Sequence, residues 1–173
     1  MEDVKTAPKT HLNYGLIIGL LMVVLFVLYY VFGLMTNTAL GVVPAVIFII
    51  LIIIAQVNHA KAVDGDITYG NLFAVGFKTT AVATCIYVLF LIIFLLLVPS
   101  YKDQVLDAQR QKMVAKGTLS EDQINAGITM AKKIFTVTSV AAAVFGNLVV
   151  GCIGSLIGAA IAKKNPQAPS LNM

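Results

Sequence analysis

Residues 143–162 read AVFGNLVVGCIGSLIGAAIA, and this apolar stretch holds four of the chain's 13 glycines. At helical spacing, four of its small residues and one asparagine fall within about 80° of a single face. These residues are Ala143, Asn147, Gly151, Gly154 and Gly158. Glycine destabilises a helix in water, but in a bilayer a face of small residues lets a second helix approach closely. We therefore predict a transmembrane helix whose small face, called the packing seam below, contacts other helices.

The composition indicates a membrane protein. Hydrophobic residues make up 59% of the 173 residues and charged residues only 12%, with a mean hydropathy of +0.92. Soluble domains carry about 25% charged residues, so this chain has too little charge to cover a soluble globule. The net charge is +4, but Lys and Arg are scattered at the ends of apolar segments. That pattern suits contact with lipid headgroups and argues against a nucleic-acid partner.

Four apolar runs are long enough to cross a bilayer, for which a helix needs about 20 residues. They occupy residues 16–34, 39–57, 79–98 and 143–162. The first run exceeds the roughly 7–15 apolar residues of a signal peptide, so we interpret it as a span. The pattern predicts an all-α integral membrane protein with four transmembrane helices and a long amphipathic helical linker between helices three and four.

The linker carries its own helix signals. Ser120 and Gln123 have the spacing of a capping box, and Gly117 is the expected end of the helix before it. Ser100 and Asp103 resemble a further cap. The linker thus predicts two helices near the membrane surface, which either rest on lipid or dock a partner. The resulting segments are a polar N-terminal segment (1–14), transmembrane helices one to three (15–99), the linker (100–135), transmembrane helix four (136–162) and a flexible tail (163–173).

Polar residues also indicate where the earlier spans begin and end. Gln56, Asn58 and His59 follow the second run, and we expect them at its exit into water, with His59 as an interfacial loop residue rather than a ligand. Thr68 is placed to cap the third helix. Pro44, near the start of the second helix, predicts either a late helix start or a modest kink.

Two polar residues, one just before the third apolar run and one within the fourth, have more than one interpretation. Lys78 fits an interfacial position, where its stem lies along apolar surface and its ammonium reaches the headgroups. A buried functional lysine is the alternative. Asn147 stands on the packing seam, where its amide either hydrogen-bonds a neighbouring helix or lines a narrow polar path.

The sequence contains no recognisable motif for catalysis, cofactor binding or metal binding. The four apolar runs hold no Asp, Glu, Arg or His, and intramembrane enzymes and proton-coupled carriers need such groups at depth. The chain has no nucleotide-binding loop, no nucleophile elbow and no zinc-ligand spacing. We therefore expect that the protein is not an enzyme, and we assign no catalytic, cofactor-binding or metal-binding residue.

Five stretches taken together resemble one bacterial family. They are GLIIGL at 15–20, GDITYGNLFAVGF at 65–77, LVPSYKDQVLDAQRQKM at 97–113, LSEDQINAGITMAKK at 119–133 and GNLVVGCIGSLIGAAIAKK at 146–164. In this order they resemble the four-span membrane proteins of domain of unknown function family 4199, known chiefly from Bacteroidetes-type bacteria. The resemblance implies a multi-pass inner-membrane protein and brings no activity and no functional residues. The family often has a proline near the start of span four. Here TVTS stands at 136–139, which leaves a helix break there in doubt.

The functional expectation is a structural or accessory membrane protein that acts through helix packing and partner docking. The alternative is a small transporter or channel component, as an oligomer. The expected partners are the lipid bilayer and either a second copy of the chain or another membrane protein. We expect the protein in the cell membrane, specifically the bacterial inner membrane.

Overall fold

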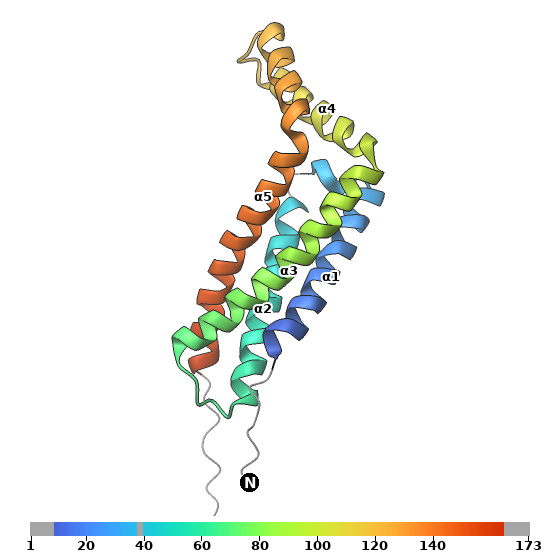
Figure 1. Ribbon diagram of the computed structural model, residues 1–173. Coiled ribbons are helices and arrows are strands. Elements are labelled where there is room, and N and C mark those ends of the chain that lie inside the picture. Colours follow the sequence, from blue (N-terminus) through green and yellow to red (C-terminus); the bar gives the residue numbers. More distant parts are fainter. Residues whose placement is uncertain (1–8, 38–39, 165–173) are drawn as a thin grey trace, which may run out of the picture.

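The computed structural model describes residues 9–37 and 40–164 (Figure 1). This part of the chain is almost entirely helical and contains no strand, which confirms the all-α prediction. Two short 3₁₀ turns connect the first two long helices: η1 (Leu34–Thr36) and η2 (Leu40–Val42). The α-helices are α1 (Thr10–Val31), α2 (Val43–Ala62), α3 (Tyr69–Leu97), α4 (Pro99–Lys116) and α5 (Glu121–Lys164). Residues 1–8 of the predicted N-terminal segment and residues 165–173 of the predicted tail lie outside the described residues.

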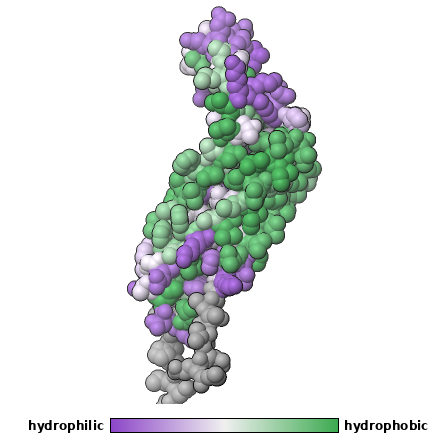
Figure 2. Space-filling model, viewed as in Figure 1, coloured by the Kyte–Doolittle hydropathy of each residue, from purple (hydrophilic) through white to green (hydrophobic). Residues whose placement is uncertain are grey.

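Four of the helices are long and apolar enough to cross a membrane, as predicted. They are α1, α2 together with η2, α3 and α5. Successive spans run in opposite directions, so the start of α1 and the end of α5 lie at the same end of the bundle (Figure 1). Large apolar side chains are exposed along the spans and form a broad apolar band (Figure 2). The protein is a multi-pass membrane protein.

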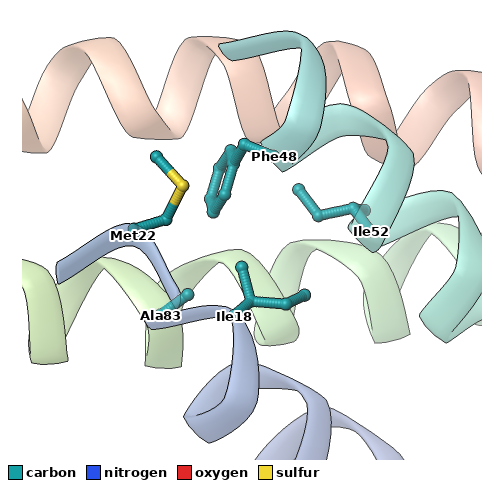
Figure 3. Packing of buried hydrophobic residues seen from close by; sticks show 5 residues of the cluster. All are labelled: Ile18, Met22, Phe48, Ile52 and Ala83. Carbon is teal, nitrogen blue, oxygen red and sulfur yellow. The ribbon is translucent and has the colours of Figure 1, made fainter. Parts of the chain in front are cut away.

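The bundle has two buried apolar clusters, one between α1, α2 and α3 (Figure 3) and one between α2, α3 and α5. α1 packs mainly against α3, and α5 packs against both α3 and α2. The two glycines of α1 bring it close to α3. A Cβ added at Gly15 would lie 2.6 Å from Cβ of Val82, and one added at Gly19 would lie 2.9 Å from Cβ of Ile86. The first cluster consists of Ile18, Met22, Phe48, Ile52 and Ala83, and the second of Ala60, Leu72, Ala159 and Ala162.

Most of the predicted helix ends are confirmed. The Thr68 hydroxyl caps α3 by accepting a hydrogen bond from the backbone N–H of Asn71. Ser120 and Gln123 form the reciprocal bonds of a capping box at α5. Gly117 ends α4 in the left-handed conformation, with φ of 62°. α2 begins late, with Pro44 in its first turn, because a proline there loses no helical hydrogen bond.

The cap predicted at Ser100 and Asp103 is wrong. α4 begins two residues after α3 ends, with Val98 as its N-cap and Pro99 in its first turn, and no side chain caps it. The proline, whose φ is preset for a helix, determines this start. Asp103 instead lies 3.2 Å from the Lys132 ammonium of α5. Both side chains of that ion pair are largely exposed, so it contributes little to stability.

α4 and residues 121–137 of α5 form a hairpin, called the arm below, that projects beyond the end of the bundle (Figure 1). The linker contains two helical segments, as predicted. They do not lie along the edge of the apolar band, because the hairpin extends away from it (Figure 2). α5 is one continuous helix of 44 residues. It runs without a break from the arm, past the boundary expected at 135/136, to the far end of the bundle.

Candidate functional site

The glycines of the packing seam lie where α5 meets α2 and α3. Gly151, Gly154 and Gly158 are all buried. A Cβ added at Gly151 would collide with the Thr80 side chain of α3, and one added at Gly158 would collide with the Gln56 amide of α2. At Gly154 the nearest atom would be 3.4 Å away, an ordinary contact. Ala143, one end of the seam, is only half-buried.

Gln56 joins three helices, and sequence analysis missed it. We expected Gln56 at an exit into water, but its side chain is completely buried. Its amide nitrogen donates hydrogen bonds to the carbonyl oxygens of Leu72 on α3, at 2.8 Å, and of Ser155 on α5, at 2.9 Å. Its Oε1 has no hydrogen-bond partner among the described residues and lies against Gly158. The signal in the sequence was helical spacing, because Gln56 follows buried Phe48 and Ile52 at four-residue intervals.

Two further hydrogen bonds tie α1 to the last turn of α2. The Thr10 hydroxyl lies 2.8 Å from Nδ1 of His59, and the Asn58 amide donates to the Tyr14 hydroxyl. The prediction of His59 as an interfacial loop residue is wrong, since His59 lies inside α2 and is buried. These contacts close the end of the bundle where α1 begins.

The opposite end of the bundle contains two adjoining cavities of about 260 Å³ each. Both are lined by Met22 of α1, Pro44 of α2 and Tyr87 of α3. The first cavity is also lined by the α1–α2 connection and by Tyr101 of α4. The second cavity is also lined by Asn147 of α5. Asn147 thus faces a cavity, and no hydrogen bond joins its side chain to another described residue.

An aromatic cluster fastens the arm to the bundle. Phe26 of α1 makes edge-to-face contacts with Phe94 of α3 and Tyr101 of α4, with ring centroids 5.0 Å and 5.8 Å apart. Tyr101 also contacts Phe135 of α5 at 6.4 Å. Such pairs stabilise by about 0.5–1.5 kcal/mol each beyond the area that they bury. Burial raises the pKa of the Tyr101 phenol above its usual value, because the charged form is poorly solvated there.

Lys78 lies on the exposed side of α3. It is not part of the buried polar contacts around Gln56, and its interfacial position stays a prediction. Among the residues that the structure describes, no group of three or more His, Cys, Asp or Glu side chains is placed to hold a metal ion.

A family model described as "Protein of unknown function (DUF4199)" matches residues 13–164, which is most of the chain. The chain belongs to this family. No curated protein and no solved structure matches it. The description of the DUF4199 family assigns no activity. Its α5 continues unbroken through residues 136–139, where the resemblance left a helix break in doubt.

Proposed function

We propose that this DUF4199 protein is an accessory protein of the bacterial inner membrane that docks another membrane protein through its arm. One observation carries the proposal. Three large apolar side chains of α5 stand exposed at helical spacing on or beside the polar arm: Met130, Ile134 and Val137, with 66%, 44% and 72% of their surface accessible. We call them the arm stripe. Contiguous apolar surface outside a protein core is typical of an interaction site.

A groove beside the arm stripe suits a helical partner. Ile134 also lines a groove of about 400 Å³ between α4 and α5, with Leu106 and Phe135 at its base. An amphipathic helix binds such a groove through apolar residues three or four positions apart. The stripe has the same spacing, so a partner helix could run alongside α5 and continue into the bilayer.

The attachment of the arm also favours docking. α5 has no break between arm and bundle, and the aromatic cluster around Tyr101 holds α4 against α1 and α3. The arm therefore has a fixed direction relative to the spans. A preorganised surface binds without the entropy cost of ordering a flexible hairpin.

The transport alternative has less support from the interior of the bundle. Between α2, α3 and α5 the interior is filled at Gln56, Thr80 and Ser155, each less than 2% exposed. Thr80 and Ser155 donate back to the carbonyl oxygens of Gly76 and Gly151 in their own helices. Polar side chains engaged in this way stabilise helix packing and leave no open polar path at this level.

Site-directed photo-crosslinking in native membranes tests the proposal. A benzophenone amino acid at Met130 is expected to capture one membrane protein in stoichiometric yield, and Ile134→Glu is expected to abolish the capture. The matched control is Val114, which is 56% exposed near the tip of α4. A benzophenone there should capture nothing, and Val114→Glu should not affect capture at Met130. Lipid adducts alone, or equal capture from both positions, would overturn the proposal, and a product of twice the chain's mass would identify a second copy as the partner.

A further inference from the structure

The two adjoining cavities at the arm end of the bundle have the features of a ligand site. They share Met22, Gly41, Pro44 and Tyr87 in their linings, so they adjoin between α1, α2, α3 and α5, and the pair is called the hollow below. Sites for small molecules are typically of about 300–1,000 Å³ and mostly apolar, with a few polar groups that orient the ligand. Each cavity has a volume of about 260 Å³, slightly below the lower end of this range, and the two together fall within it.

The polar groups at the inner end of this hollow lack partners. No hydrogen bond joins the Asn147 amide or the Tyr87 hydroxyl to another described residue. An unsatisfied polar group at membrane depth costs free energy. A ligand that offers a hydrogen-bonding oxygen at this point would remove the cost.

The rest of the lining restricts the ligand. The described lining holds no Asp, Glu, Lys, Arg or His, so a charged headgroup would find no counter-charge. Aromatic rings stand on several sides of the hollow, from Phe26 and Tyr29 of α1, Phe48 of α2 and Tyr87 of α3. Such rings favour edge or stacked contact with a flat ring. Phospholipid headgroups do not meet these conditions.

We infer that the hollow binds a neutral, ring-bearing membrane lipid of the quinone class. The ring lies among Phe26, Phe48 and Tyr87, and a ring carbonyl accepts hydrogen bonds from the Asn147 amide and the Tyr87 hydroxyl. The inference concerns binding alone, with no electron transfer assigned. It does not depend on the docking role of the arm.

A matched pair of small probes tests the inference on the full chain in phosphatidylcholine nanodiscs. The probes are 2,3-dimethyl-1,4-naphthoquinone and 2,3-dimethylnaphthalene, which share ring and methyl groups and differ in the two oxygens. Ligand that binds only the folded state raises the melting temperature in a concentration-dependent, saturable way. We expect that response from the quinone and not from the hydrocarbon.

Variants locate the binding. Asn147→Leu is expected to move the half-maximal quinone concentration at least tenfold higher, and Tyr87→Phe, which keeps the ring, should weaken binding in the same direction. Asn125→Leu, an exposed asparagine on the same helix, is the control and should leave the response unchanged. If Asn147→Leu does not fold, Tyr87→Phe decides. Equal responses to both probes, or a quinone response that neither cavity variant alters, would overturn the inference.

Discussion

The Gln56 side chain donates a 2.9 Å hydrogen bond to the carbonyl oxygen of Ser155, a residue 99 positions later in the chain. The same amide nitrogen also donates to the carbonyl oxygen of Leu72. One side chain of α2 therefore fixes the positions of α3 and α5 along their axes. Apolar contacts between transmembrane helices specify such positions weakly, whereas a directional bond to a particular carbonyl specifies one turn of each helix.

Replacing Gln56 tests how much these bonds stabilise the bundle. Hydrogen bonds between helices in membranes contribute on average about 0.6 kcal/mol and at most about 1.7 kcal/mol each, so Gln56→Leu is expected to lose about 1–3 kcal/mol. Unfolding of the detergent-solubilised protein measures the loss. Gln111→Leu, an exposed glutamine of α4, is the control and should have little effect. Equal effects of both changes would show that the bonds do not contribute measurably.

Alanine substitutions separate the glycines of the packing seam. An added Cβ collides with Thr80 at Gly151 and with Gln56 at Gly158, and overpacking costs about 1–3 kcal/mol. Gly154→Ala should be nearly neutral, since its Cβ would make ordinary contacts at 3.4 Å and beyond. Gly146→Ala has open space around it and serves as the control. The same unfolding measurement ranks the four variants, and the packing argument is wrong if Gly146→Ala destabilises as much as Gly158→Ala.

The aromatic cluster predicts that loss of the Tyr101 ring makes the arm more mobile relative to the bundle. Tyr101→Leu removes ring contacts to Phe26, Phe94 and Phe135 while leaving the four spans intact. The distance between spin labels at Arg110 and Lys163, attached in a background lacking Cys85 and Cys152, should then have a broader distribution. Tyr69→Leu removes an exposed tyrosine at the other end of the bundle and should leave the distribution narrow. An unchanged distribution in Tyr101→Leu would mean that the hairpin is held by α5 alone.

Labelling from each side of the membrane checks the topology. Single cysteines at Lys116, Asp64 and Lys163 stand in the arm, in the turn between α2 and α3, and at the end of α5. Because one span separates the arm from the end of α5, we expect Lys116 to be labelled from one side and the other two from the opposite side. Labelling of Lys116 and Lys163 from the same side would contradict the assignment of α5 as a span.

Local signals in the sequence predicted much of the fold. Hydropathy located the four spans, since the cost of placing each residue in lipid sums along a segment. Thr68, Gly117 and the Ser120–Gln123 pair predicted helix ends because a cap depends on residues within one turn. Ser100 misled because Pro99, the residue before it, already occupies the first turn of α4.

The buried polar contacts could not be predicted from local signals in the sequence. The position of Gln56 near the end of an apolar run indicates water, and only the approach of α3 and α5 buries it. The same holds for His59, whose partner Thr10 lies 49 residues earlier. The small residues of α5 could be assigned to one face from spacing. The sequence could not show whether Asn147 bonds to another helix or faces a cavity. That cavity is also lined by Tyr87 and Pro44, which belong to two other helices.

The continuity of α5 determines where its two ends lie. At about 1.5 Å per residue, its 44 residues measure about 66 Å along the helix axis. This length exceeds the roughly 30 Å thickness of the hydrocarbon core. One uninterrupted helix therefore begins in the arm on one side of the membrane and ends on the other side, and no loop separates the span from the arm.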